Sequence, residues 1–266
     1  MTSLFTLTRR AALALAAAAL AAPLAHADTT KLKVGIMGGE DESVWAVVAE
    51  QAKPLGLEIE TVIFNDYTQP NEALARKEID ANAFQHGPYL DAQIAAHGYE
   101  ISIAIDTAIF PIGLYSRKYD SIEALPEGAV IGVPNDPSNG GRALKVLEQL
   151  GLITVRPEAG ILATVIDVSE NPRNYDLREL DAGVVGRAID DLDAAVVNTD
   201  WAAKADLLDH RIAQEAGENN PYTNFIAVRT EDKDAPWVAA LQQAFQNDAV
   251  KQAYAEAYKG AAVPAW

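Results

Sequence analysis

The chain has 266 residues and is strongly acidic, with 38 Asp and Glu against 21 Lys and Arg and a formal net charge of −17 at pH 7. Such a charge repels phosphate backbones and anionic lipid, so the composition argues against a nucleic-acid partner and against peripheral membrane binding. The sequence contains no cysteine, which excludes a disulfide framework and a lipid attached to an N-terminal cysteine. With 49% apolar residues, the chain can bury one large core or two medium ones.

Residues 1–27 have the pattern of a cleavable export signal. Arg9 and Arg10 precede a run of Ala and Leu, and Ala25-His26-Ala27 has the small residues that signal peptidase reads. We therefore expect cleavage after Ala27 and a mature protein that is soluble in an exported compartment, without a lipid anchor. The arginine pair fits both the general secretory route and the twin-arginine route. No later segment of the sequence is long and apolar enough to span a bilayer.

Strands and helices alternate after the signal, which predicts an α/β fold with a largely parallel sheet. Predicted strands cover residues 31–35, 57–64 and 79–84, and a helix follows each of them. Residues 101–116 are apolar but contain Pro111 and Gly113, which suits a crossing segment between two lobes better than a central strand.

The alternation resumes beyond that segment. Residues 76–84 and 187–198 both contain a helix end, an acidic turn and a strand of small residues, which favours two lobes of similar build. The elements predicted in this part are strands at 130–133, 164–168, 193–198 and 225–228 and helices at 142–150, 178–189, 201–208, 235–245 and 250–258.

The stretch from residue 133 to 144 reads Val-Pro-Asn-Asp-Pro-Ser-Asn-Gly-Gly-Arg-Ala-Leu and is predicted to be a polar turn between a strand and a helix. Gly140 and Gly141 let a ligand approach the backbone, and Arg142 is predicted in the first helical turn. A guanidinium beside free helix amides favours a carboxylate or a phosphate. The alternative is a capped turn with a solvated arginine. Asn139 either contacts the ligand or caps the helix, and we favour the cap.

Polar and aromatic residues lie at the carboxyl ends of the predicted strands, where ligands bind in open parallel sheets. We expect two half-sites, one in each lobe, to face each other across a cleft. Core packing for the aromatic residues and helix capping for the asparagines are the structural alternatives. The candidate site residues are Tyr67, Phe84, His86, Tyr89, Arg142, Asn198 and Asn224.

His86 is the candidate with the most possible roles. His97 and His210 stand alone and no cysteine is present, so the sequence predicts no metal site. No Gly-x-Ser-x-Gly nucleophile accompanies His86, so we predict neither a catalytic residue nor a cofactor. A neutral imidazole that forms hydrogen bonds in a pocket wall is the interpretation that remains.

Three stretches, Asn65-Asp-Tyr-Thr-Gln-Pro-Asn71, Asp80-Ala-Asn-Ala-Phe-Gln-His-Gly-Pro-Tyr-Leu90 and residues 134–144, resemble the methionine-binding periplasmic proteins of ABC importers, the NlpA/MetQ lipoprotein family. Residues 193–198 and 220–224 continue the similarity in the same order. The resemblance implies a type II-like periplasmic binding protein with two α/β lobes that close on one amino acid. Residues 28–112 and 222–266 would form lobe 1, and residues 113–221 would form lobe 2.

The resemblance also implies roles for the candidate residues. Arg142 would hold the carboxylate of methionine or a close derivative, and Asn198 and Asn224 would contact its head group. The aromatic set would enclose the thioether, which agrees with the affinity of aromatic rings for polarisable sulfur. The implied partners are an ABC permease and its ATPase, and the implied state is a monomer. The alternatives are an enzyme on the same fold that uses His86 as acid or base, and a binding subunit for another small amino acid or a methionyl dipeptide.

The sequence departs from the family pattern in ways that bear on the ligand. No cysteine is present to carry the lipid of a lipoprotein. Gly87 replaces a larger residue between His and Pro, and Thr199-Asp200-Trp201 stands where the family more often has Gly or Asn and Tyr. The preference between L-methionine, D-methionine and their derivatives therefore stays open.

Overall fold

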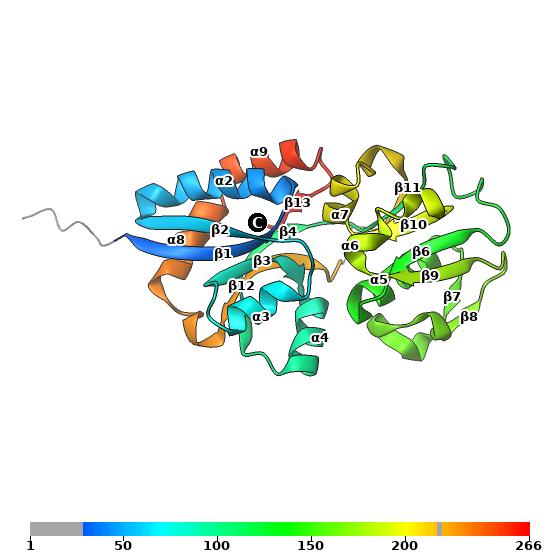
Figure 1. Cartoon of the computed structure of the whole chain (residues 1–266), viewed down its shortest axis with the longest axis horizontal. Coiled ribbons are helices and arrows are strands. Elements are labelled where there is room, and N and C mark those ends of the chain that lie inside the picture. Colours follow the sequence, from blue (N-terminus) through cyan, green and yellow to red (C-terminus); the bar gives the residue numbers. More distant parts are fainter. Residues whose placement is uncertain (1–28, 217–219) are drawn as a thin grey trace, which may run out of the picture.

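The computed structural model describes residues 29–216 and 220–266. The predicted export signal lies outside these residues. Within them the chain forms two α/β lobes that lie side by side along the long axis of the molecule (Figure 1). None of the helices in the described ranges has both the length and the apolar character that a membrane span requires.

The first lobe contains a six-stranded sheet in the order β13-β4-β12-β3-β1-β2. β1 pairs in parallel with β2 and β3, whereas β12 runs antiparallel to both of its neighbours, β3 and β4. The largely parallel direction predicted for this sheet thus holds apart from strands contributed by the C-terminal part of the chain. The six strands are β1 (Thr30–Met37), β2 (Leu57–Phe64), β3 (Ala81–His86), β4 (Ile101–Ile109), β12 (Thr223–Arg229) and β13 (Val263–Pro264).

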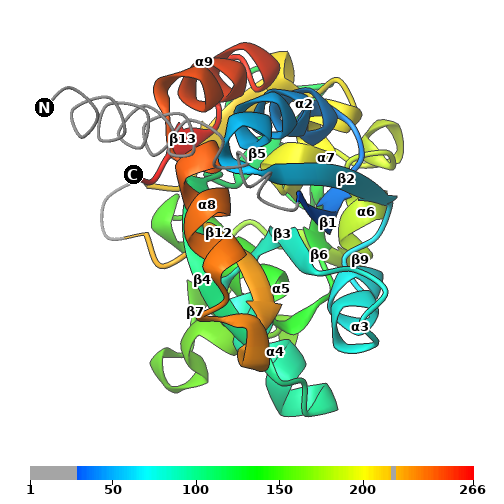
Figure 2. The same cartoon turned by 90° about the vertical axis from the view of Figure 1, so that its left-hand side faces the viewer.

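Helices cover both faces of this sheet, and α2, α8 and α9 share one of them (Figures 1 and 2). Their apolar residues form one core with the strands, in which Trp45 of α2 and Phe245 of α8 lie 5.4 Å apart between ring centroids. α3 and α4 pack on the other face through residues such as Leu74 and Leu90. The helices are α2 (Glu40–Ala52), α3 (Gln69–Ala75), α4 (Gly87–His97), α8 (Pro236–Phe245) and α9 (Asp248–Ala257), with the 3-10 turns η1 (Lys53–Leu55) and η6 (Thr230–Asp232).

The second lobe contains a five-stranded sheet in the order β11-β5-β10-β6-β9, in which β6 pairs in parallel with β10 and β9. α5 packs on this sheet through a buried stripe that includes Leu144 and Leu147. The strands are β5 (Gly113–Tyr115), β6 (Val130–Pro134), β9 (Asp176–Leu180), β10 (Ala194–Val197) and β11 (Arg211–Gln214), with a separate pair β7 (Thr154–Val155) and β8 (Val168–Glu170). The helices are α5 (Pro137–Gln149), α6 (Ala182–Val185) and α7 (Thr199–Lys204), with the 3-10 turns η2 (Pro157–Leu162), η3 (Val165–Asp167), η4 (Ile189–Asp191) and η5 (Leu208–His210).

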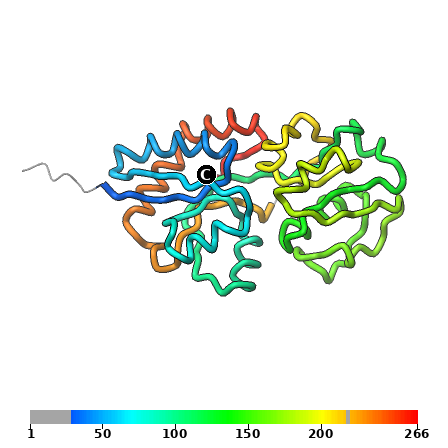
Figure 3. Tube along the Cα trace, viewed as in Figure 1, coloured from blue at the N-terminus to red at the C-terminus, as the bar shows by residue number. Residues whose placement is uncertain are grey.

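The chain passes between the lobes from β4 to β5 and again from β11 to β12 (Figure 3). The apolar run 101–116 is therefore two strands in different sheets, and residues 110–112 connect them. The second passage returns the chain to the first sheet, where β12 lies between β3 and β4. Phe110 of the first passage lines the pocket described below, and Glu215 of the second passage contacts a residue of its wall.

Two of the predicted elements are wrong. Residues 164–168 are not a strand, because the Asp167 side chain accepts from the amide and hydroxyl of Thr164 and closes a 3-10 turn that leaves Ile166 80% exposed. Residues 178–189 are not one helix, because 178–180 belong to β9 and pair with β6. Asp181 then begins α6 by accepting a hydrogen bond from the amide of Gly183. A local side-chain hydrogen bond thus closes the turn in the first case, whereas pairing with β6 and the Asp181 cap divide the predicted helix in the second.

α5 begins at Pro137, five residues before the predicted start, and this changes the role of its glycines. A Cβ on Gly141 would overlap the carbonyl oxygen of Ile161, and one on Gly140 would lie 2.9 Å from the carbonyl oxygen of Pro134. The prediction that these glycines admit a ligand is therefore wrong. They let the helix pack closely against the backbone of its own lobe.

We predict that Gly141→Ala destabilises the protein by about 1–3 kcal/mol, because the added methyl group forces apart α5 and the backbone at Ile161. This loss exceeds the gain of about 1 kcal/mol that alanine brings to a helix interior. Chemical unfolding measures the difference. Gly87→Ala is the matched control, because a Cβ there meets nothing within 4 Å. Equal stability of the two variants would contradict this packing account.

Candidate functional site

A pocket lies between the two lobes, and its walls come from both of them. The first lobe supplies residues of β1, β3, β4 and β12, of the turn after β2 and of helices α2, α4 and α9, and the second lobe supplies α5 and the start of α7. The structure thus brings together side chains that are more than 150 residues apart in the sequence. All seven candidate residues line this pocket, namely Tyr67, Phe84, His86, Tyr89, Arg142, Asn198 and Asn224.

Aromatic rings form one wall of the pocket. Tyr67, in the turn between β2 and α3, lies 5.8 Å from Phe84 and 6.0 Å from Tyr89 between ring centroids. Phe84 and Tyr89 are 5.7 Å apart and edge to face. Behind this wall, Trp201 of α7 in the opposite lobe packs on Tyr67 with 5.6 Å between ring centroids, a contact that the sequence did not predict. Such a wall suits an apolar and polarisable group of a ligand.

His86 is held as a neutral imidazole. Its Nδ1 accepts a hydrogen bond from the amide of Tyr89 at 3.2 Å, which caps α4, and this assigns the proton to Nε2. Nε2 in turn lies 3.1 Å from Oδ1 of Asn139 in the other lobe. Burial, followed by the charge of Arg142, lowers the pKa of His86 to about 3. A ring that is neutral and engaged at both nitrogens has no lone pair available for general base catalysis.

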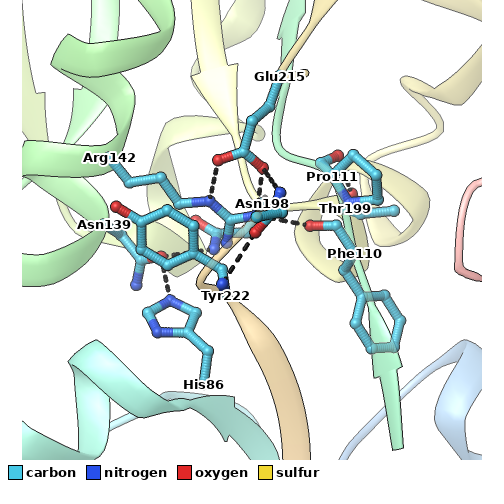
Figure 4. A network of polar contacts seen from close by, with 10 residues as sticks. His86, Phe110, Pro111, Asn139, Arg142, Asn198, Thr199, Glu215 and Tyr222 are labelled. Atoms are coloured by element: carbon cyan, nitrogen blue, oxygen red, sulfur yellow. Dashed lines mark hydrogen bonds and ion pairs between the residues drawn. The ribbon is translucent and has the colours of Figure 1, made fainter. Parts of the chain in front are cut away.

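Asn139 connects the two lobes and does not cap α5. The cap is Asp136, whose carboxylate accepts from the amide of Asn139 at 2.9 Å, so the capping role that we favoured for Asn139 is wrong. The Asn139 side chain instead donates to Asp136. Its Oδ1 accepts from Nδ2 of Asn198 at 2.8 Å and from His86 (Figure 4). Oδ1 of Asn198 is buried, and it has no hydrogen-bond partner in the described parts of the chain.

Arg142 lies in the second turn of α5, not in the first, and is 2% exposed. Its Nε and Nη2 donate to the two carboxylate oxygens of Glu215 at 3.0 and 2.6 Å, and Nη2 also donates to the carbonyl oxygen of Phe110 at 2.9 Å (Figure 4). The guanidinium carbon stands 4.1 Å from the centre of the Tyr222 ring. Among the described residues, nothing forms a hydrogen bond with Nη1. One edge of the guanidinium is therefore filled by the protein, and Nη1 keeps its capacity to donate hydrogen bonds.

The two asparagines do not act as helix caps. Asn198 stands at the cap position of α7 but its side chain makes no capping hydrogen bond. Asn224 lies within β12, opposite His86 in the register with β3, and donates from Nδ2 to the carbonyl oxygen of Phe84 at 3.3 Å. The structural alternative of capping is therefore wrong for both residues.

Comparisons with known proteins identify the family. The model of the NlpA lipoprotein family matches residues 32–266. The chain belongs to the NlpA lipoprotein family. It is 42% identical to the D-methionine-binding lipoprotein MetQ of Escherichia coli strain K12 over 244 residues, 90% of each chain.

Solved structures give the same assignment. A nutrient-binding protein from Burkholderia cenocepacia, solved bound to methionine, is 46% identical with a TM-score of 0.86 and covers 88% of this chain and 100% of its own. The substrate-binding protein of a methionine transporter from Streptococcus pneumoniae is 34% identical with a TM-score of 0.84, and the match covers 89% and 96% of the two chains.

Within this NlpA-family fold, Asp200 lines the pocket from the second lobe. The hydroxyl of Tyr67 donates to both carboxylate oxygens of Asp200, at 2.6 and 2.7 Å. Nearby, Nζ of Lys204 lies 3.3 Å from Oδ1 of Asn65 in the first lobe. These contacts join α7 to the turn after β2, so the structure shows the lobes closed on each other.

Asp41, in the first turn of α2, is a second acid in the pocket wall. Its Oδ1 accepts from the hydroxyl of Tyr258 at 2.7 Å. Burial raises the pKa of Asp41 to about 7, and the charges of Asp200 and Glu40 act in the same direction. No group of three or more potential metal-ligating side chains occurs in the ranges that the structure describes.

Sequence reasoning missed Glu215, Tyr222, Trp201 and the pair of acids, Asp41 and Asp200. Tyr222 and Trp201 do lie in stretches noted for the family pattern, so their positions could have been examined for ligand contacts. Nothing local marks Glu215 or Asp41 among the 38 acidic residues of the chain. Their partners Arg142 and Tyr258 are 73 and 217 residues away in the sequence.

We predict that Asp41→Asn removes a pH-dependent cost from folding. Between pH 3.8 and about 7 the folded protein holds a proton on Asp41 that the unfolded chain releases, so this contribution to stability is complete below pH 3.8 and is lost as the pH rises through 7. The asparagine keeps an acceptor for Tyr258 and cannot ionise. Its stability relative to the wild type should rise from near zero at pH 4 by at most about 4 kcal/mol at pH 7.5.

Urea unfolding across this pH range measures that difference. Asp120→Asn, at an exposed position of the second lobe, is the control and should leave the pH profile unchanged. Parallel profiles for Asp41→Asn and the wild type would show that Asp41 does not carry the pH dependence.

Proposed function

We propose that the protein captures methionine, as L- or D-methionine or a close derivative, in the pocket between its lobes and delivers it to an ABC permease. The observation that carries this proposal is a pair of open polar positions opposite the aromatic wall. Within the part of the chain that the structure describes, Nη1 of Arg142 is a donor without a partner and Oδ1 of Asn198 is a buried acceptor without one. A carboxylate and an ammonium on one carbon supply the two complementary groups.

The roles of the remaining site residues follow from this placement of the ligand, with its carboxylate at Arg142 and its ammonium at Asn198. Oδ1 of Asn224 contacts the head group, while Tyr67, Phe84, His86 and Tyr89 enclose the side chain. An aromatic enclosure of this kind favours a thioether over a polar side chain, because sulfur is polarisable and needs no hydrogen bond. The relative from Burkholderia cenocepacia, with methionine bound and 46% identity, supports this ligand.

Delivery depends on closure of two lobes, which we assign to residues 28–112 with 222–266 and to residues 113–221. A ligand that contacts both lobes favours the closed form, and a shift of that equilibrium from 1:99 to 99:1 takes about 5.5 kcal/mol of preference. The permease and its ATPase then distinguish loaded from empty protein by shape. We place this cycle in the periplasm with a monomeric protein, and the chain has no cysteine to carry a lipid anchor.

Binding without catalysis is the function that the site supports. His86, the only candidate acid or base of the alternative enzyme, is neutral and hydrogen-bonded at both nitrogens. The relatives compared above are named as binding proteins. Native mass spectrometry of the purified protein tests the proposal directly. It should show a bound mass of methionine or a close derivative, recovered unaltered after prolonged incubation.

We predict that Asn198→Ala weakens methionine binding by about tenfold to a hundredfold, because the ligand ammonium loses its acceptor in a dry pocket, a loss of about 1–3 kcal/mol. Isothermal titration calorimetry with L-methionine, D-methionine and methionine sulfoxide measures the change and sets the order of preference. Asn135→Ala, an exposed asparagine in the turn before α5, is the control and should bind as the wild type does. Undiminished affinity in Asn198→Ala would remove this residue from the site.

A further inference from the structure

Glu215 occupies the edge of Arg142 that a ligand carboxylate would otherwise use. We propose that Glu215 makes the pocket selective for zwitterions, because it cancels the charge of Arg142 before any ligand binds. This inference rests on the proposed function and adds to it the electrostatic rule by which the site accepts or rejects an amino acid and its analogues.

The structure holds Glu215 rigidly. The residue is 6% exposed and lies in the passage from β11 to β12, where its amide donates to the carbonyl oxygen of Ile112 at 2.9 Å. Its carboxylate accepts from Nε and Nη2 of Arg142 and, at 2.8 Å, from Nδ2 of Asn220. A carboxylate with three donors is a fixed countercharge and does not move aside for a ligand.

With this ion pair in place, the side chains of the described pocket wall have no net positive charge. Arg142 is neutralised by Glu215 and His86 is neutral, while the two acids of the described pocket wall, Asp41 and Asp200, add no positive charge in either protonation state. A ligand with a carboxylate alone would bring an uncompensated negative charge into a buried site, which is costly. An amino acid brings its own compensating ammonium.

The polar atoms without a partner in the described chain match the carboxylate and the ammonium of an amino acid. Nη1 of Arg142 can still donate to a carboxylate, while Oδ1 of Asn198 can accept from an ammonium or from a hydroxyl. Hydrogen bonding alone therefore does not distinguish methionine from an analogue in which a hydroxyl replaces the ammonium. The charge that Glu215 sets in the pocket does distinguish the two ligands, so an experiment can separate the effect of charge from that of hydrogen bonding.

The test compares L-methionine with (S)-2-hydroxy-4-(methylthio)butanoate by calorimetry at pH 7.5 and fixed ionic strength. We expect the wild type to bind the hydroxy acid at least a hundredfold more weakly than methionine. In Glu215→Gln this ratio should fall at least tenfold, because the pocket then carries the positive charge of Arg142 when empty. Glu215→Asp keeps the charge, so it should keep the wild-type ratio even where both affinities weaken. Glu158→Gln, an exposed acid of the same lobe, should change nothing.

Each outcome decides a separate question. Equal ratios in Glu215→Gln and the wild type would show that Glu215 only positions Arg142, and would overturn the inference. The wild type alone also tests the inference. If it binds the hydroxy acid within threefold of methionine, the inference is overturned, even where Glu215→Gln fails to fold. Failure of the wild type to bind methionine would instead overturn the proposed function.

Discussion

The ion pair between Arg142 and Glu215 is the interaction on which the rest of the site depends. Removing two charges from water costs several kcal/mol for each ion, and the cost is offset only where further hydrogen bonds complete the pair. Here the carbonyl oxygen of Phe110 and the amide of Asn220 complete it, and the Tyr222 ring covers it. These partners come from both passages of the chain between the lobes. The pair therefore fixes α5 against the connection between the lobes and sets the direction in which the guanidinium can meet a ligand.

The polar network and the aromatic wall divide the pocket into two chemical halves. His86 belongs to both, because its ring lies edge to face with Tyr89 and Tyr222 while Nε2 contacts Asn139 of the opposite lobe. Tyr67 also belongs to both halves, because its ring is part of the aromatic wall and its hydroxyl donates to Asp200 of the opposite lobe. Residues that line the pocket thus also join the lobes, so the contacts that enclose a ligand and the contacts that hold the closed form are the same ones.

Elements with strong periodicity could be predicted from the sequence, and so could the candidate residues at the ends of strands. β2 has the predicted bounds of 57–64, and all seven candidate residues meet in one pocket. The carboxyl end of β3 lies at the same edge of the sheet as the amino end of the antiparallel strand β12, which brings Asn224 opposite His86. Predictions were wrong where one side chain redirected the backbone, as Asp167 and Asp181 do. Glu215 could not be found, because an acid that pairs over 73 residues leaves no local pattern. The cap of α5 is Asp136 and not Asn139, and the sequence could not decide between them because both are acceptable caps and lie three residues apart.

The position of β12 has a consequence for how the protein is made. This strand lies in the interior of the first sheet, between β3 and β4, yet it follows the whole second lobe in the sequence. A growing or translocating chain can assemble the five-stranded sheet from residues 113–214 while the six-stranded sheet still has an open gap. The lobe that begins first is therefore completed last, and until residue 229 arrives β3 and β4 expose unpaired edges.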